Sequence, residues 1–143
     1  MSAKPINNAT YRRKFDNERP DLMIMALRVR GLETSAIPKV KVLACDGSSG
    51  EDVLVEFHEE FGLSYEIGEE LELELTYSRP ELKERKDYCG RAFLYSIKEK
   101  ENKKVYLFSI GGFILRIASP RELADLEVAK EYYFCLRRAR RAV

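Results

Sequence analysis

The sequence has no run of apolar residues long enough to cross a membrane as a helix. Such a span needs roughly 18 residues, and no apolar run in the 143-residue chain approaches that length. Residues 1–20 are polar and charged, and they lack the apolar segment of a secretory signal. Hydrophobic residues still make up 45 % of the chain, which excludes a disordered protein. We therefore expect one folded, cytoplasmic domain with no membrane contact.

The residue types that most often carry catalysis or bind metals are scarce. His58 is the only histidine, and it precedes Glu59 and Glu60 in a predicted loop after a strand. We assign it a structural or solvent-exposed role in preference to a catalytic His–carboxylate pair. The acidic residues lack the spacing of a calcium-binding loop, and the glycines lack the pattern of a phosphate-binding loop. The sequence predicts no catalytic residue, no metal site and no cofactor.

Three cysteines are present, and none lies in a CxxC pair. Cys45, Cys89 and Cys135 are far apart in the sequence. An odd number of cysteines without an export signal is typical of a reduced, intracellular protein. We therefore expect free thiols, with Cys135 buried as an inert core residue. Glutamine is absent and asparagine is rare, while Lys, Arg and Glu are abundant, and this composition leans toward a thermophilic source.

Charge is nearly balanced overall but uneven along the chain. The 25 basic and 24 acidic residues leave a net charge of +1. Residues 51–75 contain ten acidic residues and no lysine or arginine, whereas residues 137–141 contain four arginines. The acidic segment would repel phosphate, and basic termini could either reach a partner or nucleic acid or be solvated tails. We predict a flexible basic arm over residues 1–19, a folded domain over 20–138 and a basic tail over 139–143.

Short alternations of apolar and polar residues predict eight β-strands. They cover residues 21–30, 39–45, 53–57, 71–75, 90–98, 105–110, 113–117 and 131–138. In residues 71–75 three leucines alternate with glutamates, so the pattern favours a strand although both residue types favour helices. Eight short strands, separated by turn residues and without a domain linker, indicate an all-β antiparallel barrel or sandwich.

One apolar run is interrupted by two glycines, and another run, residues 39–45, alternates cleanly between two faces. Gly111 and Gly112 interrupt an apolar run, which suggests a bulge, a sharp bend or a close approach of backbone. In residues 39–45 one face would be buried and one solvated. One face carries Val40, Val42 and Ala44, and the other carries Lys39, Lys41 and Leu43.

One short helix is expected before the last strand. Ser119 is a suitable N-cap, Pro120 favours the first helical position, and Glu122 completes a capping box. Leu123 and Leu126 would form the apolar side of this helix.

Three blocks of sequence, taken together, resemble one protein family. Residues 108–117 read FSIGGFILRI, residues 90–93 read GRAF, and residues 133–138 read YFCLRR. These blocks resemble the eighth small subunit shared by the eukaryotic nuclear RNA polymerases and its archaeal counterpart, the G subunit. The resemblance covers residues 20–138. Eukaryotic members carry a long polar insertion where only residues 77–87 stand here, so the chain is more similar to the archaeal protein.

The resemblance implies an eight-stranded antiparallel barrel similar to an OB fold. It also implies a non-catalytic, peripheral subunit of archaeal DNA-directed RNA polymerase that docks on the largest subunit, which holds the catalytic Mg²⁺. No cofactor and no small-molecule substrate follow from it. The candidate docking residues are Gly111, Gly112, Arg116, Arg137 and Arg138. The glycine pair could instead be a bend of the barrel, and Arg116 could pair with the chain's own acidic segment.

A second function class is a free-standing, OB-like protein that binds single-stranded nucleic acid. Its support is the predicted barrel, the basic termini and a set of strand aromatics that could stack on bases. These aromatics are Tyr88, Phe93, Tyr95, Tyr106, Phe108, Tyr132, Tyr133 and Phe134. The same residues could equally fill a barrel core. The acidic segment and the near-neutral net charge argue against this class.

Overall fold

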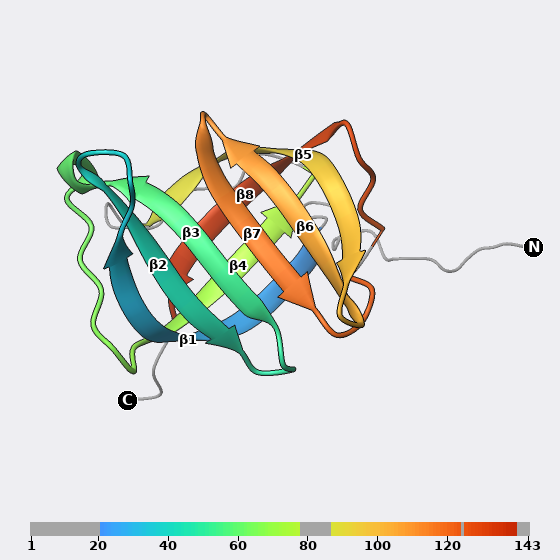
Figure 1. Cartoon of the computed structure of the whole chain (residues 1–143), viewed down its shortest axis with the longest axis horizontal. Coiled ribbons are helices and arrows are strands. Elements are labelled where there is room, and N and C mark those ends of the chain that lie inside the picture. The colour runs from blue at the N-terminus through green and yellow to red at the C-terminus, as the bar shows by residue number, and fades with distance from the viewer. Residues whose placement is uncertain (1–20, 78–86, 124, 140–143) are drawn as a thin grey trace, which may run out of the picture.

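Eight strands close into one barrel (Figure 1). The computed structural model describes residues 21–77, 87–123 and 125–139. The strands are β1 (Asp21–Thr34), β2 (Val40–Gly47), β3 (Asp52–His58), β4 (Glu70–Thr76), β5 (Tyr88–Lys100), β6 (Lys103–Ile110), β7 (Phe113–Ser119) and β8 (Lys130–Arg138), and a short 3₁₀ helix, η2 (Glu59–Phe61), follows β3. Around the barrel the order is β1-β2-β3-β7-β6-β5-β8-β4, and all neighbours are antiparallel. The predicted all-β, eight-stranded antiparallel barrel is confirmed.

The first strand closes the barrel because it is long enough to pair on both sides. Its first half pairs with β4 from Asp21 to Arg28, and its second half pairs with β2 from Leu27 to Thr34. The ladder with β2 contains a shift of register between Val29 and Gly31. Such an irregularity bends a strand and increases its twist, as closure of a barrel requires.

The core is built from the inward faces of all eight strands. In β4 the inward residues Leu71, Leu73 and Leu75 are at most 1 % exposed, while Glu70 before them and Glu72 between them remain exposed, and Glu74 is buried. Fully burying one such leucine stabilises the fold by about 1.5–3 kcal/mol. The alternation therefore decides the structure of this segment against the helix propensity of its residues.

The inward face of β2 is the one that carries Leu43. Leu43 lies opposite Val55 of β3, and Cys45 lies opposite Val53. Residues paired across an antiparallel ladder share a face, so Leu43 and Cys45 join the core, where neither has any exposed surface. Val40 and Ala44 on the other face are also buried, at 5 % and 1 % exposed, although they lie outside the core cluster. The expectation that one face of this strand is solvated is therefore wrong.

The predicted helix before β8 is wrong. Ser119 is the last residue of β7, and the described residues between β7 and β8 contain no helix. Two core tyrosines accept hydrogen bonds from main-chain N–H groups that would bond within the helix if one formed here. The Tyr106 hydroxyl accepts from the N–H of Leu123, and the Tyr132 hydroxyl accepts from the N–H of Glu127, each at 2.9 Å. Tertiary hydrogen bonds thus replace the capping box.

The prediction of three free thiols is wrong for two of them. Cys89 of β5 and Cys135 of β8 are directly opposite in the ladder and form a disulfide, with their Cα atoms 4.1 Å apart. The two residues are separated by 46 positions in the sequence, so only the pairing of the strands brings them together. Cys45 is the free, buried cysteine. Within the described part of the chain, no helix is long and apolar enough to span a membrane.

Candidate partner-docking site

The backbone ladder between β3 and β7 stops before the end of β3 and after the start of β7. The ladder between these strands contains four residue pairs and ends at Val55 and Leu115. Beyond it, the N–H of Ile114 donates to a carboxylate oxygen of Glu56, and the Tyr88 hydroxyl donates to the Glu56 carbonyl, each at 2.9 Å. Burial raises the pKa of Tyr88, so its hydroxyl stays protonated as a donor. Side chains therefore hold this seam where the ladder stops.

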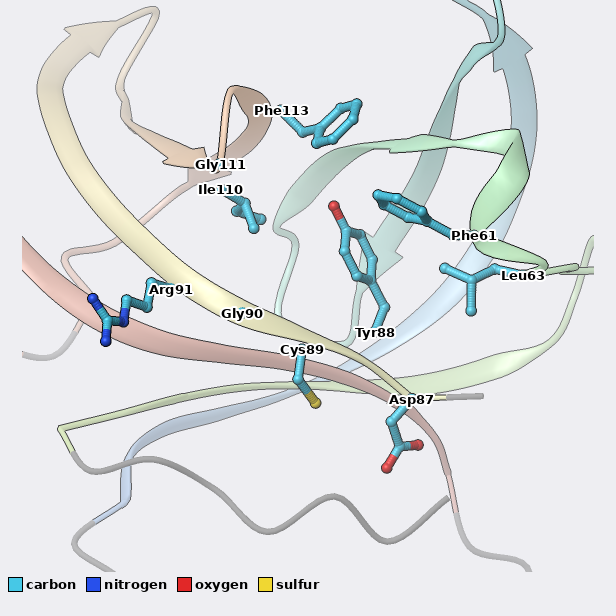
Figure 2. Close-up of a pocket in the computed structure, with 10 residues that line it drawn as sticks. All are labelled: Phe61, Leu63, Asp87, Tyr88, Cys89, Gly90, Arg91, Ile110, Gly111 and Phe113. Carbon is cyan, nitrogen blue, oxygen red and sulfur yellow. The ribbon is translucent and has the colours of Figure 1, made fainter. Parts of the chain in front are cut away.

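A hollow of about 570 Å³ lies beside the seam, at the end of the barrel that carries η2 (Figure 2). Its apolar lining consists of Phe61, Leu63, Tyr88, Ile110 and Phe113. The Phe61 ring packs edge-on against Phe113 with centroids 5.5 Å apart, and its centroid lies 5.8 Å from that of Tyr88. Tyr88 is 7 % exposed and Phe61 is 48 % exposed. The hollow therefore combines a buried aromatic floor with an accessible aromatic edge.

Gly90 allows β5 to pass close beside Ile110 at this hollow. A Cβ atom added at Gly90 would lie 3.3 Å from Cγ2 of Ile110, a tighter contact than ordinary van der Waals packing. Figure 2 shows the Ile110 side chain above the strand at Gly90, to the left of the Tyr88 ring. The glycine of the sequence block at residues 90–93 therefore keeps space open at the floor of the hollow.

Gly111 and Gly112 form the tight turn that joins β6 to β7. Their φ angles are +59° and +100°, the left-handed region that glycine adopts without strain. The N–H of Gly112 donates to the Ser109 hydroxyl at 3.2 Å. Positive φ at both central residues is what a two-residue hairpin of the correct twist requires. The sharp bend is therefore the predicted alternative that the structure contains. Both glycines are exposed and Gly111 lines the hollow, so this bend also lies at the candidate site.

Arg137 lies behind the hollow in a buried ionic cluster. It donates to Glu74 through Nη1 at 2.6 Å and to Asp87 through Nε at 3.0 Å. The Arg137, Glu74 and Asp87 side chains are 16 %, 8 % and 6 % exposed. Asp87 also lines the hollow. The guanidinium is thus occupied within the chain, and it reaches the site only through its partner Asp87.

Arg138 and Arg116 lie outside the hollow and also bind carboxylates of their own chain. Arg138 pairs with Glu69 at 2.6 Å, and its guanidinium lies 5.3 Å from the ring centroid of Tyr65. Arg116 pairs with Asp52 at 3.8 Å. Of the two interpretations of Arg116, the pair with the acidic segment is the one that the structure contains.

Arginines from β1 and β8 offset much of the acidic segment. Besides the pairs above, Arg28 pairs with Glu70 at 2.9 Å, and Arg30 bonds to Asp52 at 3.1 Å. In the barrel β1 lies between β4 and β2, and β8 lies on the other side of β4. Both strands come from parts of the sequence outside residues 51–75. The repulsion of phosphate that the sequence indicates is therefore weaker on the folded surface.

His58 has a structural role, as predicted. Its Nδ1 accepts the N–H of Glu60 at 3.0 Å, so the imidazole caps the short 3₁₀ helix η2. The capped helix ends at Phe61, and both Phe61 and Leu63, two residues later, line the hollow. Among the residues that the structure describes, no group of three or more His, Cys, Asp or Glu is arranged to hold a metal ion.

Most strand aromatics fill the core instead of forming a stacking surface. Five of the eight are at most 7 % exposed: Tyr88, Tyr106, Phe108, Tyr132 and Phe134. Phe93 and Tyr95 lie on the outer face of β5 and are each 41 % exposed. The eighth, Tyr133, is half-buried. Two exposed rings are less than the continuous platform that single-strand binding proteins use.

The sequence reasoning missed Phe61, the most exposed aromatic of the hollow. In the sequence Phe61 follows Glu59 and Glu60 and precedes Gly62, in a loop without a periodic pattern, so little marks it as a site residue. An apolar ring in such a turn has no local partner to bury it, and this is the feature that could have identified it. Its packing against Phe113, 52 positions away, exists only after the barrel closes.

Comparison with known proteins agrees with the resemblance in the sequence. The family of the G subunit of DNA-directed RNA polymerase matches residues 22–139, which is nearly the whole barrel. No curated protein matches the chain. Among solved structures, a cytoplasmic molybdate-binding protein, ModG, aligns with a TM-score of 0.32 and 10 % identity over 81 % of this chain and 89 % of its own. A likeness at that level carries no argument about this protein. The family match does, and the chain belongs to the family of the DNA-directed RNA polymerase G subunit.

Proposed function

We propose that this chain is a non-catalytic, peripheral subunit of archaeal DNA-directed RNA polymerase. In this role it works in the cytoplasm, docks on the largest subunit and supports assembly of the complex. The observation that carries the proposal is the family match over residues 22–139. The barrel over residues 20–138 would supply the docking surface. The predicted basic arm (1–19) and tail (139–143) lie almost entirely outside the described residues, and contact of these segments with nucleic acid is part of the test.

The site chemistry supports a docking role over a catalytic one. The charged groups near the hollow are engaged in ion pairs and hydrogen bonds, as in the Arg137 cluster. The accessible groups are an aromatic edge and a glycine turn, which are features of a protein contact. A specific contact of this kind needs about 800 Å² from each partner, so the hollow would be the centre of a larger surface.

Co-purification tests the proposal. The tagged chain is expressed in its native cell and purified at about 0.3 M salt, where the Debye length is well below 10 Å and weak charge contacts are screened. Recovery of the complete polymerase is the expected result. Recovery of nucleic acid alone, released by nuclease treatment, would replace the proposal with the free-standing nucleic-acid-binding class. Recovery of no polymerase from an extract that contains it would contradict the proposal.

A further inference from the structure

We propose that the outer side of β3, β7, β6 and β5 docks on a segment of the polymerase in which a carboxylate stands between apolar side chains, and that Arg116 donates hydrogen bonds to this carboxylate. This inference rests on the proposed function, and it names one surface of the barrel and the chemistry of the segment that contacts it. The surface, which we call the outer wall, consists of Leu54 on β3, Ile114 and Arg116 on β7, Leu107 on β6, and Phe93 and Tyr95 on β5.

The outer wall is apolar, although the outward side of an antiparallel sheet is ordinarily polar. In the ladders, Arg116 lies directly opposite Leu54 on β3 and Leu107 on β6. Ile114, two residues earlier in β7, points to the same side of the sheet. Leu54, Leu107 and Ile114 are each half-buried, so they leave apolar surface in water around the guanidinium.

The apolar surface continues onto β5 and reaches the hollow. Ser109 of β6 lies opposite Ile114 on one side and Phe93 on the other. Phe93 and Tyr95 are each 41 % exposed. Phe113, which lines the hollow, immediately precedes Ile114. Figure 1 shows β3, β7 and β6 at the front of the barrel, with no other described element over them. The outer wall and the hollow can therefore belong to one docking surface.

Arg116 carries hydrogen-bond donors that its own chain does not use. Its side chain is 31 % exposed, and its Nη1 lies 3.8 Å from Oδ2 of Asp52, which is beyond hydrogen-bonding distance. The other oxygen of Asp52 accepts from Arg30 at 3.1 Å. Within the described residues Arg116 has no further polar partner. A guanidinium presents five N–H donors in a planar fork that fits a carboxylate, so Arg116 can bind a carboxylate of a partner.

The apolar neighbours of Arg116 determine what a partner must provide. A partner that covers them removes water from the guanidinium, and a charge pair is stronger where water is excluded. A guanidinium that is covered without new hydrogen bonds would lose its hydration at a large cost. The covering segment must therefore carry a carboxylate, with apolar side chains beside it that bury Leu54, Leu107 and Ile114.

The balance of charge along the outer wall favours an acidic side chain of a protein over the phosphates of nucleic acid. Proteins that bind nucleic acid gather lysines and arginines on one face. Here the wall and its edges carry both signs of charge: the cations Arg91, Lys98 and Arg116, and the carboxylates Asp52, Glu56 and Glu131. A phosphate backbone would meet these carboxylates, whereas one acidic side chain needs only the guanidinium that apolar residues surround.

Substitutions at Arg116 and Phe93 test the inference, each with a control on β1, which is next to none of the strands of the outer wall. Arg116→Met keeps a long side chain and removes the donors. Arg28→Met makes the same change at an exposed arginine of β1. Phe93→Ala removes an aromatic ring of the wall, and Ile24→Ala shortens a side chain of β1 that is 56 % exposed. Each full-length variant is titrated onto nuclease-treated polymerase assembled without this subunit, and circular dichroism confirms that the variant is folded.

Arg116→Met is expected to weaken binding at least about tenfold and Phe93→Ala at least about threefold, with less than about twofold for either control. Arg116→Lys should keep only part of the affinity, because an ammonium lacks the planar fork. If the wild type does not join the polymerase, the proposed function is wrong and this inference falls with it. If the wild type joins and Arg116→Met binds equally well, the function stands and the outer wall is not the docking surface.

A parallel titration with a single-stranded oligonucleotide distinguishes a carboxylate from a phosphate as the anion at Arg116. Arg116→Met is expected to leave the affinity for the oligonucleotide unchanged. A variant that loses affinity for the oligonucleotide but binds the nuclease-treated polymerase as the wild type does would show that Arg116 binds phosphate, and the inference would be wrong.

Discussion

At Arg137, β8 places one guanidinium between two nearly buried carboxylates, Glu74 and Asp87. Removing the cation would take the shared guanidinium away from two nearly buried carboxylates. Loss of one member of a buried ionic cluster typically costs about 3–5 kcal/mol. The cluster is therefore expected to be a determinant of stability, and through Asp87 a determinant of the shape of the hollow.

Arg137→Met is expected to lower the free energy of unfolding by about 3–5 kcal/mol near neutral pH. Urea unfolding at neutral pH measures the loss. Arg28→Met is the matched control, since the Arg28–Glu70 pair is 62 % and 57 % exposed and should contribute less than about 1 kcal/mol. Equal losses in the two variants would contradict this account of Arg137.

At the scale of the element, the β6–β7 turn depends on the backbone freedom of its two glycines. A Cβ at Gly111 or Gly112 would meet no atom within 4 Å, so a substitution there would not clash with a neighbour. The cost of an alanine at either position comes from the positive φ alone.

Gly112→Ala, at φ +100°, is expected to destabilise the barrel by about 1–2 kcal/mol and more than Gly111→Ala, at φ +59°. Gly31→Ala is the control, because the space around Gly31 is equally open and its φ is not in the left-handed region. It should be neutral or slightly stabilising. Thermal unfolding of the three variants gives the order. A Gly31→Ala variant as unstable as Gly112→Ala would show that lost glycine flexibility, and not φ, matters.

The disulfide between Cys89 and Cys135 ties β5 to β8, the two strands next to the ionic cluster. Because it closes a loop of 46 positions, it restricts the unfolded chain. Reduction should lower the free energy of unfolding by about 2–4 kcal/mol. Thermal unfolding with and without reductant measures this in the wild type. The Cys89→Ser variant should not respond to reductant, and Cys45→Ala should respond as the wild type does. Two free thiols at Cys89 and Cys135 in protein purified under non-reducing conditions would contradict the bond.

At the scale of the whole molecule, buried acids limit stability at high pH. Burial raises the pKa of Cys45 from 9.0 to about 12 and that of Tyr65 from 10.0 to about 12, and it also raises that of Tyr88. Below pH 9 neither the folded nor the unfolded chain ionises these groups, so they contribute nothing to the pH dependence. Above it the unfolded chain loses its protons first. Stability should then fall by up to about 1.4 kcal/mol per pH unit for each group.

In the window from pH 9 to 10 the cysteine of the unfolded chain, with an ordinary pKa of 9.0, ionises ahead of the tyrosines, whose ordinary pKa is 10.0. The tyrosines are common to the wild type and to Cys45→Ala, so the difference between the two proteins isolates the thiol. Denaturant unfolding across this window should show a falling stability in the wild type and a flatter profile in Cys45→Ala. The comparison uses the slope, so a constant loss from the small cavity does not affect it. Identical slopes in both proteins would show that Cys45 is not the group responsible.

Some segments of the fold were predictable from the sequence and others were not, and the difference has a physical cause. Strands with one clearly apolar face, such as residues 71–75, were predictable because burial of that face outweighs every local preference. Residues 39–45 alternate, but both faces carry apolar side chains and both are partly buried in the barrel, where the ladder with β3 directs Leu43 into the core. The capping sequence at Ser119 predicted a helix that the hydroxyls of Tyr106 and Tyr132 prevent.

The sequence by itself determined the fold class, the strands and the family, because alternation and short blocks of residues are local properties of the chain. Tertiary structure alone decided the contacts of the candidate site. It joins Cys89 to Cys135, pairs Arg137 with Glu74 and Asp87, and seats Phe61 against Phe113. Each of these contacts links residues more than 40 positions apart, and their geometry depends on the order β7-β6-β5-β8 and on the seam where β3 leaves β7. Long-range contacts of this kind form only when the barrel closes, so no local pattern specifies them.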